Sequence, residues 1–87
     1  MAAPAFQLVV TGVPLWLLRA YLEELGGRPG ADGLLQGDGW QAQLTQVEDY
    51  EIGSLRVGQV RLELDGEAEA VGRVRKALEP RLMRAGG

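Results

Sequence analysis

The chain has 87 residues, a net charge of −3 and 46% apolar residues, which together indicate one globular domain with a modest core. It contains no cysteine and no histidine, so disulfides, thiolate chemistry, Cys-based metal sites and the commonest general base are excluded. The acidic balance argues against nucleic acid or an anionic membrane as a partner. No apolar run reaches the roughly 18 residues of a membrane span. Residues 1–7 lack the features of a secretory signal, so we expect a cytoplasmic protein.

The stretch from Phe6 to Gly27, FQLVVTGVPLWLLRAYLEELGG, carries the clearest structural signal. In its first six residues Phe6, Leu8 and Val10 alternate with Gln7, Val9 and Thr11, and this period of two with β-branched residues predicts a strand with one buried face. Pro14 suits the first position of a helix. Gly26-Gly27 predicts the end of that helix in a left-handed turn. The apolar stripe of the predicted helix consists of Leu15, Leu18, Leu22 and Leu25.

Turn-forming residues dominate the segment 28–39. Within it we expect a short strand at Leu34-Leu35 and a tight hairpin at Gly37-Asp38-Gly39. Trp40 begins a second clear strand, on the buried face, so we expect it in the core. After this strand, the acidic residues 48–51 are expected to form a solvated loop, followed by a turn at Ile52-Gly53-Ser54.

The apolar positions of the next strand change phase at Gly58, because they are odd-numbered before it and even-numbered after it. Such a glycine indicates either a β-bulge or a turn between two short strands. The last segment is predicted to be a helix whose apolar stripe includes Val71, Val74 and Leu78. Pro80 predicts a kink or a break near Glu79.

The predicted order of elements is therefore β-α-β(3-4)-α. Short turns join consecutive strands, which predicts antiparallel pairing, and the two helices must bury their stripes against one face of the sheet. We predict a single two-layer α+β domain over residues 1–87. The other face of the sheet is expected to be polar and open, and it carries Gln7, Gln41, Gln43, Thr45, Arg61 and Glu63.

Residues that could carry catalysis are few. Nucleophilic candidates are Ser54, Thr11, Thr45 and Lys76, with no histidine to activate them, so we expect no enzyme, no catalytic residue and no cofactor. The acidic residues around 48–51 with Asp38 lack EF-hand spacing, which favours a solvated segment over a metal site. Thr11-Gly12-Val13-Pro14 favours a plain helix start over an anion site.

Trp16 is the residue that core packing explains least. On a helical wheel it falls near Ala20 and Glu23, opposite the leucine stripe. An exposed tryptophan is often an interface anchor; the alternative is that it packs on Pro14 or Pro29. The candidate interface residues are Trp16, Ala20, Glu23, Gln41, Gln43 and Arg61.

The segment LVVTGVPLWLLRAYLEELGG, with the β-rich region and terminal helix after it, resembles a small uncharacterised domain of thermophilic bacteria. In that family the domain follows one similar to the small, sulfur-carrying subunit of molybdopterin synthase (MoaD), which we expect this chain to lack. The resemblance implies a TATA-box-binding-protein-like fold of order β-α-β4-α. It also implies a link to molybdenum cofactor biosynthesis, and it brings no functional residues.

Three classes of function follow. The first is a non-catalytic interaction or accessory domain, expected as a homodimer. The second is a small-molecule-binding module with a Gly-rich loop over residues 26–39. The third is a nucleic-acid binder using Gln41, Gln43, Arg56 and Arg61, which the acidic balance opposes. A minor alternative is a sulfur carrier, because Gly86-Gly87 resembles the tail that ubiquitin-like carriers adenylate, although those carriers reach it from a strand and not from a helix.

Overall fold

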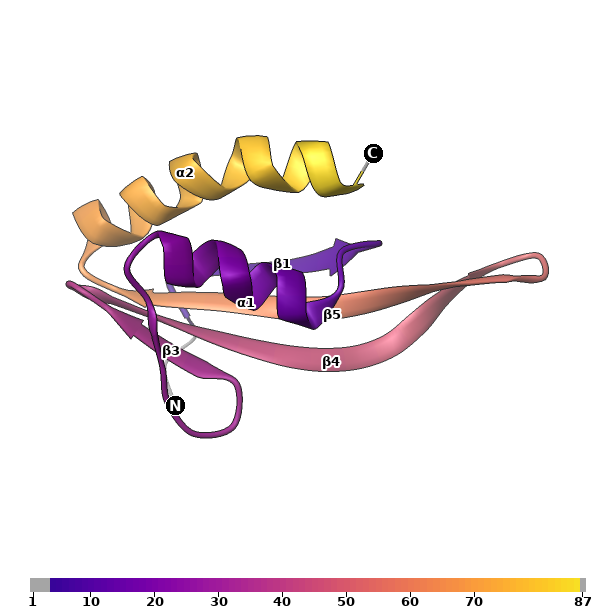
Figure 1. Cartoon of the computed structure of the whole chain (residues 1–87), viewed down its shortest axis with the longest axis horizontal. Helices are drawn as coiled ribbons and strands as arrows, with labels where there is room; N and C mark the ends of the chain where they lie inside the picture. Colours follow the sequence, from indigo (N-terminus) through magenta and orange to yellow (C-terminus); the bar gives the residue numbers. More distant parts are fainter. Residues whose placement is uncertain (1–3, 87) are drawn as a thin grey trace.

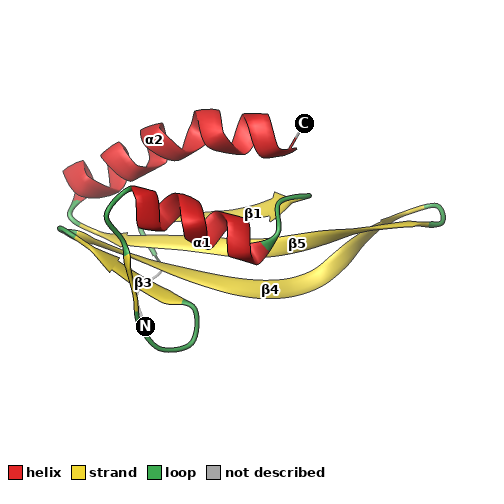
Figure 2. Ribbon diagram, in the orientation of Figure 1, coloured by secondary structure: helices red, strands yellow, loops and turns green. Residues whose placement is uncertain are grey.

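The computed structural model describes residues 4–86 of the chain. Mixed α+β structure with an antiparallel sheet is confirmed (Figures 1 and 2). The elements in chain order are β1 (Phe6–Thr11), α1 (Leu15–Glu24), β2 (Arg28–Pro29), β3 (Leu34–Gly37), β4 (Trp40–Ile52), β5 (Leu55–Gly66) and α2 (Ala68–Gly86).

One sheet of five strands organises the molecule. Its order is β1-β5-β4-β3-β2, and each neighbouring pair is antiparallel. Buried residues of both helices join those of the sheet in one core cluster, and Figure 1 shows α1 and α2 running beside the long strands. The long β4–β5 hairpin runs the whole width of the view and extends past the helices at one end.

The core lies between the sheet and the helices. Cross-strand pairing puts Leu44 opposite Leu62 and Ala42 opposite Leu64, so these side chains share one sheet face. The same buried cluster includes Leu22 of α1 and Val74 of α2. Trp40 is buried in this cluster, as predicted. Its indole ring lies so close to Gly37 that any side chain there would collide with it.

The helix α1 begins one residue later than predicted. Pro14 is the N-cap with extended backbone (φ −68°, ψ 153°), and not the first helical residue. Its carbonyl accepts the N–H groups of Leu17 and Leu18 at 3.1 Å. The predicted glycine stop is confirmed, because Gly26 has φ +100° and the N–H of Gly27 donates to the carbonyl of Leu22 at 2.9 Å.

The segment 28–39 contains a strand that the turn-rich composition concealed. Arg28 and Pro29 form β2 and pair with Gln36 and Leu35 of β3. A proline is tolerated there because β2 is an edge strand. The predicted tight connection between β3 and β4 is confirmed, with Gly39 at φ +83°.

Gly58 marks neither a turn nor an extra residue in its own strand. The strand β5 is continuous through it, and the irregularity lies in β4, between Val47 and Tyr50. Val47 pairs with Gln59 and Tyr50 with Val57, so two residues of β4, Glu48 and Asp49, face the single residue Gly58. This is a β-bulge in the partner strand. The acidic segment 48–51 is therefore part of a strand and not a loop.

Pro80 does not break the last helix. α2 runs without interruption from Ala68 to Gly86. Proline removes the N–H that would bond to the carbonyl four residues earlier and crowds that turn. Arg81 provides polar contacts at this point: its guanidinium donates to the carbonyl of Ala77 at 2.7 Å, and its Nε lies 3.9 Å from the carboxylate of Glu24 on α1.

Candidate interaction surface

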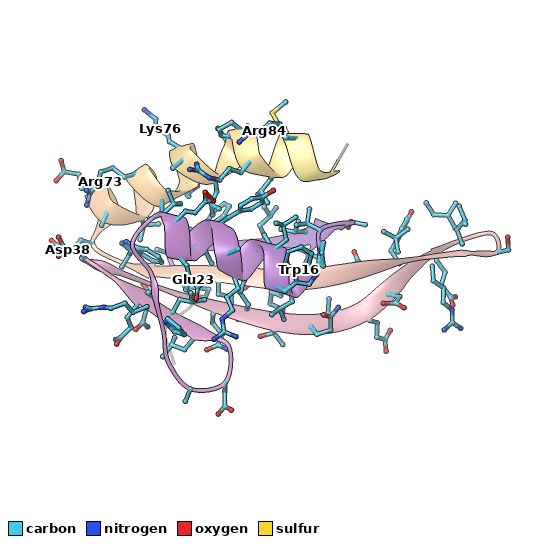
Figure 3. All side chains as sticks on the ribbon, in the orientation of Figure 1. Trp16, Glu23, Asp38, Arg73, Lys76 and Arg84 are labelled. Atoms are coloured by element: carbon cyan, nitrogen blue, oxygen red, sulfur yellow. The ribbon has the colours of Figure 1, made fainter. Side chains whose placement is uncertain are left out.

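Trp16 is exposed on the first turn of α1, as predicted. Its side chain is 69% exposed, so neither Pro14 nor Pro29 covers it. Figure 3 shows it on the outer side of α1, near the end of the helix that points toward the projecting hairpin. Ala20 is half-buried and Glu23 is exposed, with its carboxylate 3.9 Å from Nε of Arg19. The anchoring role of Trp16 stays a prediction.

A second group of exposed apolar side chains lies on the hairpin that projects beyond the helices. We call residues 48–58 the arm: they comprise the end of β4, the turn at Gly53-Ser54 and the start of β5. β1 ends its pairing at Thr11 opposite Gln59, so the arm has no third strand beside it in the described chain. Figure 1 shows it as a twisted two-stranded ribbon.

The arm has one apolar face and one charged face. Tyr50 lies opposite Val57 and Ile52 opposite Leu55, so these four side chains share a face. The exposed fractions are 49% for Tyr50, 55% for Ile52 and 66% for Leu55. On the other face Glu51 lies opposite Arg56, with 3.0 Å between the carboxylate and Nε. Exposed apolar groups that share one face are typical of interaction sites.

The bulge in β4 produces this apolar face. Before it, the even-numbered residues of β4, such as Leu44, point to the core. After it, even-numbered Tyr50 and Ile52 pair with odd-numbered Val57 and Leu55, which belong to the opposite face of β5. One extra residue thus moves the apolar side chains of β4 to the other face of the sheet. The apolar positions of β5 change from odd to even at Gly58 because the apolar side chains of the arm lie on the opposite face of the sheet from those of the core.

The arm and the start of α1 meet at a shallow hollow of about 270 Å³, lined by Gly12, Val13, Pro14, Gln46, Arg56, Val57 and Gly58. The strand-to-helix junction is itself engaged with β5. The N–H of Gly12 donates to the carbonyl of Gly58 at 2.9 Å, and Thr11 Oγ1 donates to Gln59 Oε1 at 3.1 Å. These groups hold the junction against the base of the arm.

The predicted polar sheet face brings Gln41, Gln43 and Arg61 onto the side away from the core, but not as one free surface. Gln41 is exposed and opposite Asp65. Gln43 is half-buried and its Nε2 donates to the carbonyl of Asp32 at 2.6 Å. Arg61 is half-buried between Val9 and Thr45 of the neighbouring strands. Arg56, the fourth residue of the nucleic-acid hypothesis, lies on the arm.

A pocket of about 250 Å³ lies at the opposite end of the molecule from the arm, and the sequence did not reveal it. It is lined by Leu25, Gly26, Asp38, Trp40, Ala70, Arg73, Val74 and Ala77. Figure 3 shows Asp38 and Arg73 at this end. The only signal in the sequence was the Gly-rich segment 26–39, whose two ends contribute to the lining.

The acidic residues do not assemble into a metal site. Asp38 precedes the start of β4, whereas Glu48, Asp49 and Glu51 lie toward its other end. No group of three or more potential metal ligands occurs within residues 4–86. Ser54 lies in the turn at the tip of the arm, and Lys76 is exposed on α2. Neither helix of the described chain has the length and apolar character required to cross a membrane.

One family model, described as archaeal MoaD-like protein, matches residues 6–87 of the chain. No curated protein matches the chain.

Proposed function

The chain belongs to the archaeal MoaD-like protein family, and from this premise we propose that it is a non-catalytic protein-interaction domain that serves molybdenum cofactor biosynthesis in the cytoplasm. The observation that carries the proposal is the exposed Trp16 beside an arm whose apolar face lies in solvent. Tryptophan and tyrosine are enriched among the residues that dominate binding energy at protein interfaces.

The proposed partner site consists of Trp16 on the helix side of the sheet and the apolar face of the arm on the other side, so the partner would contact both sides of the arm around the hollow at its base. Strand pairing fixes the arm's side chains in register, and α1 fixes the tryptophan. A preorganised apolar surface loses less conformational entropy on binding than a flexible one. The charged face of the arm, with its Glu51–Arg56 pair, would form part of the polar rim.

The experiment is site-specific photo-crosslinking in the native organism. A photoreactive phenylalanine analogue replaces Trp16 in one variant and Met83 in the control, because Met83 is at least as exposed but lies on α2. We expect position 16 to capture a defined protein of cofactor biosynthesis and position 83 to capture none. Capture of the same proteins from both positions, or of none from position 16, would contradict the proposal.

A second candidate, a small-molecule-binding module, is supported by the pocket near Trp40. Its lining combines apolar Leu25 and Val74 with Asp38 and Arg73, which suits a small ligand carrying both charges. The variant Ala77→Phe would fill the pocket. A metabolite that raises the melting temperature of the wild type and not of Ala77→Phe would support this candidate, and a screen without any such compound would remove it.

The third candidate, a sulfur carrier, is supported by a family match that extends over Gly86-Gly87. Gly86 is the last residue of α2, and Gly87 lies outside the described residues. The tail would have to leave the helix to enter an adenylating enzyme. Intact-mass measurement of the protein purified from its own organism tests this candidate. A C-terminal thiocarboxylate has sulfur in place of one carboxylate oxygen, so the corresponding increase in mass would support the candidate and its absence would remove it.

We also propose that the fold is TATA-box-binding-protein-like. The element order β-α-β-β-β-β-α and the packing of both helices into the same core cluster as the sheet support this classification (Figure 2). Fold alone does not fix function, so the classification carries no claim of nucleic-acid binding. An experimental structure compared with that fold would test it.

A further inference from the structure

The two edges of the sheet differ in how they are protected. β2 forms one edge, has only two residues, and contains Arg28 and Pro29. Short edge strands, charges and proline are the usual means of preventing one sheet from pairing with another. β1 forms the other edge with six residues, FQLVVT, and has no charge, no proline and no bulge.

The free side of β1 presents backbone groups in a defined pattern. The N–H of Gly12 donates to Gly58 of β5 at 2.9 Å, so the carbonyl of Thr11 points away from β5. Because successive residues of an antiparallel strand alternate in direction, the N–H and C=O groups of Gln7, Val9 and Thr11 lie on the free edge. Such a row is complementary to the backbone of another strand.

Side chains on both faces of β1 leave apolar surface beside this edge. Leu8 lies opposite Leu62, which is fully buried, so both belong to the core-facing side, yet Leu8 is 40% exposed. Val9, on the other face, is 44% exposed. The core layer is therefore incompletely covered at this edge. A strand added alongside β1 would cover Leu8 and Val9 together.

The distribution of charge points to a second copy of this chain as the occupant. Two copies carry the same net charge of −3 and repel one another unless they meet through neutral surface. β1 and the turn after it contain no charged residue, since the first in the sequence is Arg19, although Arg75 of α2 lies 4.1 Å from the ring centre of Phe6 at one end of the strand. An uncharged strand edge is complementary to itself.

We propose that β1 pairs antiparallel with β1 of a second copy about a two-fold axis, which joins the two sheets into one. Antiparallel pairing of identical strands gives the closed, isologous contact typical of homodimers. The proposal is independent of the proposed function, because it uses a sheet edge and not Trp16 or the arm.

Two variants of Val9 test the pairing, with one control. Val9→Pro removes an N–H that points away from β5 and has no strand beside it within residues 4–86, and Val9→Glu places a carboxylate from each copy near the axis. Glu at position 9 would face Arg61 of β5 and so suit the monomer. The control Gln36→Glu adds the same charge opposite Arg28 on the far side of the sheet.

Molar mass by light scattering gives the readout. We expect the wild type and Gln36→Glu at twice the 9.4 kDa of one chain, and both Val9 variants at the monomer mass. A monomeric wild type at high concentration, or dimeric Val9 variants, would overturn the proposal. Should circular dichroism show Val9→Pro unfolded, amide exchange of the wild type decides. The Val9 N–H must exchange at least tenfold more slowly at high than at low protein concentration, and equal rates would reject the pairing.

Discussion

The two ends of the β4–β5 hairpin use the same kind of residue for different purposes. At the end near Trp40, paired residues such as Leu44 and Leu62 are covered by the helices. At the arm, the pairs Tyr50–Val57 and Ile52–Leu55 are also apolar, but they lie beyond the helices and largely in solvent. Apolar alternation thus reports strand pairing at both ends, and only the helices decide which end becomes core.

The largest contrast is expected for truncation of one apolar side chain at each end. Leu62→Ala removes a fully buried side chain at the centre of the core and should lower the free energy of unfolding by about 2–5 kcal/mol. Ile52→Ala on the arm should change it by less than about 0.5 kcal/mol, because the side chain is exposed. Urea denaturation measures both, and similar losses would mean that the arm is covered in solution.

The second-largest contrast is expected between the stability costs of replacing a glycine at each end of the hairpin. Gly66 has φ +130°, and an added Cβ would collide with the backbone of Gly39 and Trp40. Gly66→Ala should therefore cost on the order of 1–3 kcal/mol. Gly53 at the tip of the arm has φ +60° with open space around it. Gly53→Asn should cost less, because asparagine tolerates this conformation. Thermal unfolding compares them, and an equal cost would contradict the difference in packing.

Deletion of Asp49 would test the role of the bulge. Without the extra residue, Glu48 alone would lie opposite Gly58, while Tyr50 and Ile52 would still lie opposite Val57 and Leu55. We expect the core to stay folded, with less than about 1 kcal/mol lost, since the arm is largely exposed. Nuclear Overhauser contacts between the Tyr50 ring and Val57 should persist, because the pairing toward the tip of the arm is unchanged. Their loss would show that the bulge is needed to keep the arm in register.

The smallest effect is expected at the charged face of the arm. Arg56 and Glu51 are 3.0 Å apart, but both side chains are mostly in solvent. Exposed ion pairs contribute little because water and salt screen them, so Arg56→Ala should cost no more than about 0.5 kcal/mol. Urea denaturation at low and high salt measures this, and a loss above 1 kcal/mol at low salt would indicate a structured charge network in the arm.

The sequence predicted the elements whose local signals agree, and failed where a distant contact decides. The strand, helix and glycine stop of residues 6–27 follow from periodicity and from Gly26. β2 was missed because Arg28 and Pro29 become a strand only through β3. Pro80 does not break α2, which continues to Gly86.

The candidate site was predictable in part. Trp16 stood out on the helical wheel, and its exposure is confirmed. The phase change at Gly58 indicated a bulge or a turn, but the arm was not predicted, because the extra residue lies in β4 opposite Gly58 and is defined only by the pairing of the two strands. Apolar residues alternate both around Leu62, which is buried, and around Leu55, which is exposed. Periodicity alone does not show which of these residues the helices cover.

The measurement that tests the central claim most directly is a nuclear magnetic resonance map of the chain bound to the protein captured at position 16. We predict that the largest amide shift changes fall on Trp16 and on the arm residues Tyr50, Ile52 and Leu55, and that Trp16→Ala abolishes them. Changes confined to α2 or to the pocket near Trp40 would contradict the assignment of this surface.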